Sequence, residues 1–438
     1  MKRHIGRGVT VISLGCSKNL IDSEHLLHQF RQAGFEIRHD RLPQRGDVVV
    51  VNTCGFIQDA KEESVQTILQ YCEQRRKGRI SRLYVMGCLS QRYFDELKQE
   101  IPEVDGFYGK FDWQNILRDL GREYQVSERH DRVLTTPSHY AYIKIAEGCN
   151  RHCSFCAIPL ITGPYQSRPI EDIRQEISVL AARGVKEFQI IAQDLSYYGK
   201  DLYHEFKLAE LIDEISEIQG VEWIRLHYAY PYMFPYDILP LIRDKANVCL
   251  YLDMALQHCS DHMLQLMHRH ISGQETVELL RRIRHEVPGI HLRTTLMVGH
   301  PGETEADFEQ LKSFVEEMRF ERMGAFTYSA EEGTYSGDHY QDDVPEDVKE
   351  ARMNELMSIQ QRISMQINQA KIGQRLRVII DREDEDYYVG RTQYDSPEVD
   401  PEVFVSKDRK LSVGEFYDVL IEDAAEFDLF ASSAVPVK

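Results

Sequence analysis

The sequence predicts an α/β protein in three parts: an N-terminal domain with a parallel sheet flanked by helices, a central partial (β/α)6 barrel, and a small antiparallel β-barrel. Three patterns predict this arrangement. Apolar runs typical of strands alternate with helical patterns in the first third of the chain and again, six times, in the middle, and the tail alternates apolar and polar residues. At 438 residues the chain also exceeds the roughly 100 to 200 residues of one ordinary domain.

The N-terminal domain, predicted over residues 1–126, repeats one pattern three times: an apolar run, a cysteine and a helical stretch. The cysteines are Cys16, Cys54 and Cys88. Because the carboxyl ends of parallel strands lie at one edge of a sheet, where such sheets bind ligands, we expect the three thiols to lie close together. The predicted strands are 9–14, 48–51 and 83–86, and the predicted helices are 23–33, 59–76 and 91–101.

The central domain is predicted over residues 141–370, after an aperiodic linker at 127–140. A (β/α) barrel carries its active site at the carboxyl ends of its strands. A long helix is predicted to begin near Pro345, a residue type favoured in first helical turns, and to run to Ala370. The six predicted strands are 141–145, 187–191, 223–227, 248–252, 291–298 and 323–328.

The tail, residues 371–438, is predicted to form the small barrel, with turns near 384, 396–397 and 413–414. It carries 16 Asp and Glu against 9 Lys and Arg, and five of these acids stand at residues 381–386. A run of charge is most often a solvated turn. An acidic surface also suits a basic partner, because complementary charge steers association.

The whole chain is acidic, with a formal net charge of −19. Since nucleic-acid-binding proteins normally present a basic face, no strong nucleic-acid binding is expected. No apolar run approaches the roughly 20 residues of a membrane span, and the apolar stretch at 9–14 fits a strand better than a signal peptide, so we expect a soluble, cytoplasmic protein without a membrane partner. Nine cysteines in a reducing compartment favour metal binding or catalysis over disulfides.

Three of these cysteines, Cys149, Cys153 and Cys156, lie within eight residues just after the first predicted barrel strand. Three thiolates with this spacing can ligate three irons of a 4Fe-4S cluster and leave the fourth iron open. A structural zinc ion is the alternative. It would need a fourth ligand, and the nearby His152 shares a tight turn with Cys153.

The C-x3-C-x2-C motif, with Phe155 before its last cysteine, resembles the signature of the radical S-adenosylmethionine (SAM) superfamily. With the three upstream cysteines and the β-rich tail, the whole chain resembles the methylthiotransferase family. This resemblance implies an N-terminal methylthiotransferase domain with an auxiliary 4Fe-4S cluster, a radical SAM barrel and a C-terminal TRAM domain. A non-catalytic iron-sulfur electron carrier or a zinc-stabilised binding module is the alternative from another class of protein.

The resemblance also implies roles for individual residues. Cys149, Cys153 and Cys156 would ligate the radical SAM cluster, whose open iron chelates SAM, and Cys16, Cys54 and Cys88 would ligate the auxiliary cluster, which holds the sulfur to be inserted. Four further residues stand where the superfamily places cofactor contacts, although core packing or loop architecture explains them equally well: Phe155, Gln193, Asp194 and Gly299. The remaining cysteines have no companions and are interpreted as core residues: Cys72, Cys249 and Cys259.

Local strings at residues 13–24, 52–57 and 87–93 resemble the branch of the family that methylthiolates the β-carbon of an aspartate in small-subunit ribosomal protein S twelve. The alternative is a MiaB-like tRNA methylthiotransferase, which acts on an adenosine near the anticodon. Two strings depart from the family pattern: 161–168, which is less basic than in many members, and 254–255. Both departures lie outside the cysteine motifs.

The chemistry that the resemblance implies is radical chemistry, because an aspartate β-carbon has no acidic proton that a base readily removes. Reductive cleavage of SAM yields a radical that abstracts the hydrogen, and a methylthio group is transferred to the carbon. A flavodoxin- or ferredoxin-like reductant and a sulfur donor are therefore implied as partners. We also hypothesise that the acidic turn at 381–386 receives the basic ribosomal protein.

Overall fold

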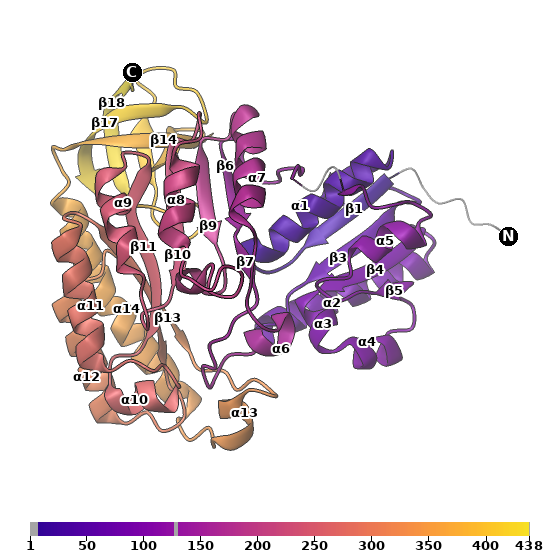
Figure 1. Cartoon of the computed structure of the whole chain (residues 1–438), viewed down its shortest axis with the longest axis horizontal. Helices are drawn as coiled ribbons and strands as arrows, with labels where there is room; N and C mark the ends of the chain where they lie inside the picture. Colours follow the sequence, from indigo (N-terminus) through magenta and orange to yellow (C-terminus); the bar gives the residue numbers. More distant parts are fainter. Residues whose placement is uncertain (1–7, 127–129, 438) are drawn as a thin grey trace.

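The computed structural model describes residues 8–126 and 130–437, which form the three parts shown in Figure 1. The first seven residues, part of the predicted linker (127–129) and residue 438 lie outside the described residues. Of the helices within the described ranges, none is long and apolar enough to cross a membrane.

The N-terminal part is a five-stranded parallel sheet in the order β2-β1-β3-β4-β5. The three predicted strands are confirmed, and the two missed strands are a short polar strand, β2, and a two-residue strand, β5. The predicted helix at 91–101 is two helices, because Tyr93 leaves helical geometry with φ −125° and ψ 41°. The elements are β1 (Gly8–Ser13), α1 (Ser17–Gln32), β2 (Glu36–His39), β3 (Val48–Thr53), α2 (Gln58–Arg76), β4 (Arg82–Gly87), α3 (Cys88–Arg92), α4 (Phe94–Glu100), β5 (Gly106–Phe107) and α5 (Gln114–Asp119).

Alternation along the strands decides which helices cover each face of this sheet. Val48 and Val50 pack with α1 and α5, whereas Val49 and Val51 pack with α2, α3 and α4. All four valines are fully buried, as expected for a parallel strand covered on both faces. The sheet is therefore a rigid base for the loops at its carboxyl edge.

The central part is an open six-stranded parallel sheet in the order β13-β12-β11-β10-β9-β6, which confirms the predicted partial barrel. Pro345 is the residue that precedes the long helix and not part of its first turn. The strands are β6 (Tyr140–Lys144), β9 (Glu187–Ile191), β10 (Trp223–Ala229), β11 (Val248–Gln257), β12 (His291–Val298) and β13 (Arg322–Thr327). The main covering helices are α7 (Ile170–Ala182), α8 (Leu208–Ser216), α9 (Leu239–Asp244), α11 (Gly273–Glu286), α12 (Glu305–Met318) and α14 (Glu346–Gln369).

Shorter elements lie in the loops of the central part. A two-stranded ribbon pairs β7 with β8 and frames the loop that carries Cys149. These short elements are β7 (Ala146–Glu147), α6 (Ile158–Thr162), β8 (Gln166–Ser167), the 3-10 turns at Leu195–Tyr197 and Tyr236–Ile238, α10 (Asp261–Leu266) and α13 (Tyr335–His339).

The tail closes into a five-stranded barrel in the order β14-β15-β16-β18-β17. The closed barrel is confirmed, but it is not wholly antiparallel, because β16 and β18 pair in parallel. Two parallel strands cannot be joined by a tight hairpin, and here β17 is the strand that lies between β16 and β18 in the sequence. The strands are β14 (Arg375–Glu383), β15 (Tyr387–Thr392), β16 (Val403–Ser406), β17 (Phe416–Ala424) and β18 (Leu429–Pro436).

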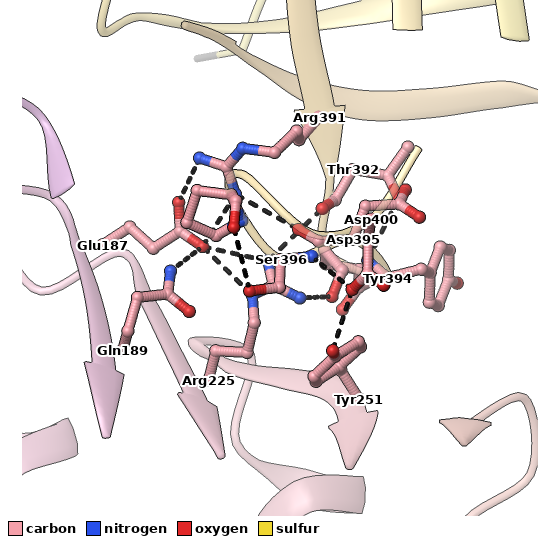
Figure 2. Close-up of polar contacts among 12 residues, drawn as sticks. Glu187, Gln189, Arg225, Tyr251, Arg391, Thr392, Tyr394, Asp395, Ser396 and Asp400 are labelled. Atoms are coloured by element: carbon pink, nitrogen blue, oxygen red, sulfur yellow. Dashed lines mark hydrogen bonds and ion pairs between the residues drawn. The ribbon is translucent and has the colours of Figure 1, made fainter. Parts of the chain in front are cut away.

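A buried ionic network joins the tail to the amino ends of the central strands (Figure 2). Arg391 on β15 donates to Glu187 Oε2 at 2.8 Å, and Arg225 on β10 donates to Glu187 Oε1 at 3.0 Å. Arg391 also donates to Asp381 Oδ2 at 2.6 Å, and His139 Nε2 lies 2.7 Å from Asp381 Oδ1. The tail is therefore held at the end of the sheet opposite to β7 and α6, the elements on either side of the cysteine-bearing loop (Figure 1).

This network changes the interpretation of the acidic run at 381–386. Its first member, Asp381, is an interface residue, and burial opposes its ionisation while Arg391 holds its pKa at about 2. Two others have cationic partners: Glu383 pairs with Lys407 at 3.0 Å and Asp384 pairs with Arg382 at 3.3 Å. Among the described residues, only Glu385 and Asp386 of the run lack an ion pair. Fewer acids of this run are therefore unpaired than the sequence suggests.

The N-terminal and central parts are joined by a second set of buried ion pairs. Arg132, fully buried in the stretch predicted to be a linker, lies 2.9 Å from Glu24 of α1 and also pairs with Glu176 of α7. Glu331 of the central part pairs with Lys61 at 2.8 Å and Arg92 at 3.0 Å. These contacts fix the distance between the carboxyl edges of the two sheets.

Candidate functional site

Cys16, Cys54 and Cys88 lie at the carboxyl edge of the N-terminal sheet. Cys16 immediately precedes α1, Cys54 immediately follows β3, and Cys88 is the first residue of α3 after β4. Gly15 is in the left-handed region with φ +89°, and a Cβ built on it would lie 2.9 Å from Cys54 Sγ. Only a glycine at position 15 allows the turn after β1 to approach Cys54 this closely.

The side chain of Asn19 connects the three cysteine loops. Its amide nitrogen donates to the carbonyl oxygens of Leu14, at 3.2 Å, and Thr53, at 2.8 Å, in the first two loops. Its Oδ1 accepts from the Cys88 thiol at 3.3 Å in the third loop. Asn19 is buried, so these bonds are shielded from water. The side-chain amide of Asn19 therefore fixes the positions of the three cysteine-bearing loops relative to one another.

The three thiols lie in one electrostatic environment. Burial raises the pKa of Cys54, and the charge of Cys16 adds to the effect. Burial likewise raises the pKa of Cys88 to about 12, with smaller contributions from Cys16 and Cys54. For Cys16 burial is outweighed by the charges of Lys18 and Lys110 and by backbone N–H groups, so its pKa lies below the usual value. Of the three thiols, only Cys16 has its pKa lowered, so it is the most acidic of the group.

The close approach of Gly15 to Cys54 gives a test of this arrangement. Gly15→Ala is expected to lower the iron bound by the N-terminal domain, because the new methyl group would lie 2.7 Å from Cys54 Cβ. Gly34→Ala is the matched control: Gly34 has nearly the same φ, +85°, but nothing within 4 Å of its Cβ position. Both variants are strained by about 1–2 kcal/mol in the backbone, and only the first disturbs the cysteines. Equal iron content in the two purified proteins would contradict the prediction.

Cys149, Cys153 and Cys156 lie in the loop beyond β6 and β7. Their thiols also influence one another: burial raises the pKa of Cys149 to about 12, with a smaller contribution from Cys153, and burial raises the pKa of Cys156 with contributions from both of the others. The backbone N–H of Arg151 donates to Cys149 Sγ at 3.4 Å. The loop thus folds so that the three sulfurs share one small region at the carboxyl end of the barrel.

Two arginines that the sequence analysis missed face these thiols. Arg269 donates to Cys153 Sγ at 3.4 Å and stacks over Tyr230, with 4.2 Å from its guanidinium carbon to the ring centroid. Arg151 stacks over the same ring at 4.3 Å. Arg269 stands between His268 and His270, which both have positive φ, 56° and 55°. Such backbone strain is typical of functional loops, but no pattern in the sequence marks it.

The predicted cofactor contacts lie around the Cys149 loop with different roles. Phe155 packs with buried methionines and Tyr328, and its ring lies edge-on to His300 at 6.3 Å. Asp194 accepts from Arg151 Nε at 2.7 Å, and burial raises its pKa. Gln193 donates to Glu147, while its Oε1 is buried without a partner among the described residues. That oxygen can accept a hydrogen bond from a bound molecule.

Gly299, the fourth predicted contact, has a structural reason for being glycine. Its φ is +73°, and a Cβ at this position would lie 2.2 Å from the side chain of Lys349. Close packing against α14 therefore explains Gly299 without a ligand. Two further polar residues near the site also have partners within the protein. Arg168 pairs with Glu176 at 2.6 Å, and His258 Nε2 lies 3.3 Å from Glu303 Oε1.

The three isolated cysteines are buried and apart from both groups of thiols. Cys72 packs between α2 and the N-terminal sheet, Cys249 packs with Trp223 and Phe416 at the tail interface, and Cys259 belongs to the central core. Burial raises the pKa of each thiol. They remain interpreted as core residues.

A charged quartet, two of whose members are buried and two partly buried, connects the surroundings of the two groups of cysteines. Lys110 and Asp22 come from the N-terminal part, and Lys144 and Glu147 come from the central part. Lys110 Nζ lies 3.0 Å from Asp22 and 3.6 Å from Glu147, and Lys144 Nζ lies 2.6 Å from Asp22 and 2.7 Å from Glu147. Lys110 is also a charge that acts on Cys16 and Cys88, and Glu147 is two residues before Cys149. The quartet therefore joins the two sites.

The donor set fits iron-sulfur clusters, whose ligands are cysteine thiolates. Each site offers three thiols at the carboxyl edge of a parallel sheet and cations that favour anionic sulfur, Lys18 and Lys110 at one site and Arg269 at the other. Across residues 8–126 and 130–437, no three His, Cys, Asp or Glu side chains form a group that could hold a single metal ion.

Three family models match successive parts of the chain. Residues 8–109 match the uncharacterized protein family UPF0004, residues 143–315 match the radical SAM superfamily, and residues 372–433 match the TRAM domain. The order agrees with the three parts of the fold.

Similar proteins match the chain over nearly its whole length. "Ribosomal protein uS12 methylthiotransferase RimO" of Parabacteroides distasonis is 60% identical, covering 96% of this chain and 98% of the relative. The protein with the same description from Porphyromonas gingivalis is 59% identical, covering 97% and 98%. Among solved structures, the radical SAM methyltransferase TsrM from Kitasatospora setae aligns with a TM-score of 0.54 at 15% identity, covering 76% of this chain and 77% of that one. That last likeness concerns the fold alone.

Proposed function

The chain belongs to the RimO family of ribosomal protein uS12 methylthiotransferases, and from this premise we propose how its residues carry out that reaction. It is a radical SAM methylthiotransferase that acts on ribosomal protein S12. We propose that the position modified is the β-carbon of an aspartate. The observation that carries this conclusion is identity of 57–60% to RimO proteins over nearly the full length. The MiaB-like alternative, a tRNA methylthiotransferase, is not favoured by these relatives.

The enzyme uses SAM and an iron-sulfur cofactor, as the radical SAM superfamily does. We assign the radical SAM cluster to Cys149, Cys153 and Cys156, and a second, auxiliary cluster to Cys16, Cys54 and Cys88. When bound, these groups supply the electron transfer, the radical and the sulfur that polar side chains cannot provide. The arrangement of six thiols in two separate groups supports this assignment.

The residues of the chain position and shield these groups. Arg269 places a buried positive charge 3.4 Å from Cys153 Sγ, where it would balance the negative charge of a thiolate-ligated cluster. Asn19 keeps the three N-terminal loops at fixed separations. The quartet around Lys110 fixes one site against the other, so that a substrate carbon held between them is in reach of both.

Partners and location follow from this chemistry as proposals. A flavodoxin- or ferredoxin-like protein supplies electrons, and a separate sulfur donor restores the auxiliary site after each turnover. The acceptor is a ribosomal protein, so the cytoplasm is the proposed location, with no membrane partner and no strong nucleic-acid binding.

Mass analysis of ribosomal protein S12 tests the function. S12 from cells that lack this gene is expected to carry hydrogen where S12 from wild-type cells carries a methylthio group, and its mass is expected to be lower by the difference between the two. The purified, reconstituted enzyme is expected to restore the wild-type mass. Bulk tRNA offered under the same conditions is expected to remain unmodified. A modified S12 in the deletion strain, or modification of tRNA alone, would refute the assignment.

The acidic turn gives a prediction about substrate binding. We expect Glu385→Gln with Asp386→Asn to weaken S12 binding a few-fold and to reduce its dependence on salt, since these are the two acids of the run without ion pairs among the described residues. Glu96→Gln with Glu100→Gln on α4 is the control, because it removes the same charge from another exposed surface. Titration of S12 at two salt concentrations is the measurement. If both double variants bound S12 with the same affinity and the same salt dependence, the acidic turn would be a solvated loop without a role in S12 binding.

A further inference from the structure

Lys18 is a half-buried cation at the contact between the N-terminal and central parts. It is the second residue of α1 and stands two residues after Cys16. Its Nζ lies 3.6 Å from the ring centroid of Tyr228, near the carboxyl end of β10. Lys18 thus points from the edge of one sheet toward the edge of the other.

The charge of Lys18 is not paired with a carboxylate of the surrounding protein. Within the described part of the chain, no carboxylate lies within 4 Å of its Nζ, whereas the neighbouring Lys110 and Lys144 are each paired with both Asp22 and Glu147. Lys18 is the exception in a region where cations and carboxylates otherwise balance.

The position of Lys18 in its helix is also unfavourable for a cation. The first turn of α1 contains no acidic residue, and the free N–H groups of a helix N-terminus carry partial positive charge. A lysine there is repelled by its own helix. An anion bound from outside would relieve this repulsion, so the site is electrostatically suited to a carboxylate.

Tyr228 holds the ammonium group without consuming its hydrogen-bonding capacity. The backbone of Tyr228 is in the left-handed region, with φ +63°, and its N–H donates to Asp253 Oδ2 at 3.3 Å. The ring is thereby fixed beneath Lys18. A ring face attracts an ammonium ion but leaves its other N–H groups free to donate.

We infer that Lys18 binds the side-chain carboxylate of the substrate aspartate, an inference that rests on the proposed function. The carboxylate is bonded directly to the reacting β-carbon. Holding it beside Cys16 and facing the barrel would place that carbon between the sulfur-holding site and the radical-generating site. An adenosine base carries no carboxylate, so the same contact favours an acidic protein side chain over tRNA.

A double-mutant cycle tests this contact through binding. Wild-type enzyme, Lys18→Met and Lys18→Arg, all reconstituted, are titrated with S12 that carries either the target aspartate or asparagine in its place. Wild type is expected to bind the aspartate form roughly ten- to a hundred-fold more tightly, the range for a hydrogen bond between charged groups. Lys18→Met is expected to bind both forms equally weakly, and Lys18→Arg to retain the preference.

The controls separate this role from others. Lys98→Met removes a lysine that also lies over an aromatic ring, Phe94, on the exposed face of α4, and it is expected to leave the preference unchanged. If Lys18→Met lost iron but still preferred aspartate, Lys18 would serve the auxiliary cluster and the inference would be wrong. If wild-type enzyme modified S12 but bound both forms equally, the inference alone would fail. If wild type neither bound nor modified S12, the proposed function itself would fail.

Discussion

Replacing Cys149, Cys153 and Cys156 together with alanine is expected to remove about half of roughly eight protein-bound irons and to abolish both SAM cleavage and methylthio transfer. The reason is that these thiols are assigned to the cluster that cleaves SAM. Replacing Cys16, Cys54 and Cys88 together is expected to remove the other half of the iron and to abolish transfer, while SAM cleavage continues. Iron analysis, electron paramagnetic resonance and the yield of 5′-deoxyadenosine after anaerobic reconstitution measure these effects.

The isolated cysteines provide the control for this experiment. Cys72→Ala and Cys259→Ala each remove a buried thiol that packs in a hydrophobic core, so they are expected to lower stability without changing iron content. Loss of all iron from either triple variant would mean that the two sites are not independent. A wild-type protein with about four irons would show that there is one cluster and not two.

The positions of the two groups of cysteines follow from the sequence, because strand patterns and cysteine spacing are local features. Each of Cys16, Cys54 and Cys88 follows a strongly apolar strand, and parallel strands bring their carboxyl ends together whatever the separation in sequence. The same rule placed the loop of Cys149 at the mouth of the barrel. Strand patterns and cysteine spacing were therefore sufficient for the positions of all six thiols.

The surroundings of these thiols could not be predicted in the same way. Arg269 and Lys110 reach the cysteines through tertiary packing between segments far apart in the chain, and an isolated lysine or arginine has no periodic signature. Lys18 is close to Cys16 in the sequence, but its contact with Tyr228 depends on packing between the N-terminal and central parts. The parallel pairing of β16 with β18 was missed for a related reason. Alternation predicts strands, but the direction in which distant strands pair depends on how the barrel closes.

The acidic run shows how a local pattern can mislead. Charge at 381–386 suggested a solvated surface, yet Asp381 is bonded to Arg391 inside the interface with the central part. The pairing of β14 with β15 shifts register between Ile380 and Arg382, so Asp381 lies at an irregularity of the strand, whereas its neighbour Arg382 is exposed and pairs with Glu402. Neighbours in a charge run can therefore face different environments.

Glu187→Ala is expected to destabilise the protein by about 3–5 kcal/mol, because it leaves two buried arginines without their shared carboxylate (Figure 2). Glu187 and Arg225 are fully buried, and Arg391 is nearly so. The matched control is Glu222→Ala, which breaks a pair with Arg377 at 2.8 Å across the same interface but at its exposed margin. Exposed pairs contribute about 0–1 kcal/mol, so chemical denaturation of the two holo-variants should separate them clearly.

The same network predicts a dependence of stability on pH. Arg391 lowers the pKa of Asp381 to about 2 in the folded protein, against roughly 3.9 for an unfolded aspartate. Because the folded pKa is the lower one, the contribution of Asp381 is fully present above about pH 4 and is lost as the pH falls toward 2. Asp381→Asn should therefore be less stable than wild type at pH 6, and the difference should shrink below pH 4. A difference that stayed constant over this range would show that Asp381 acts through packing and hydrogen bonds, not through its charge.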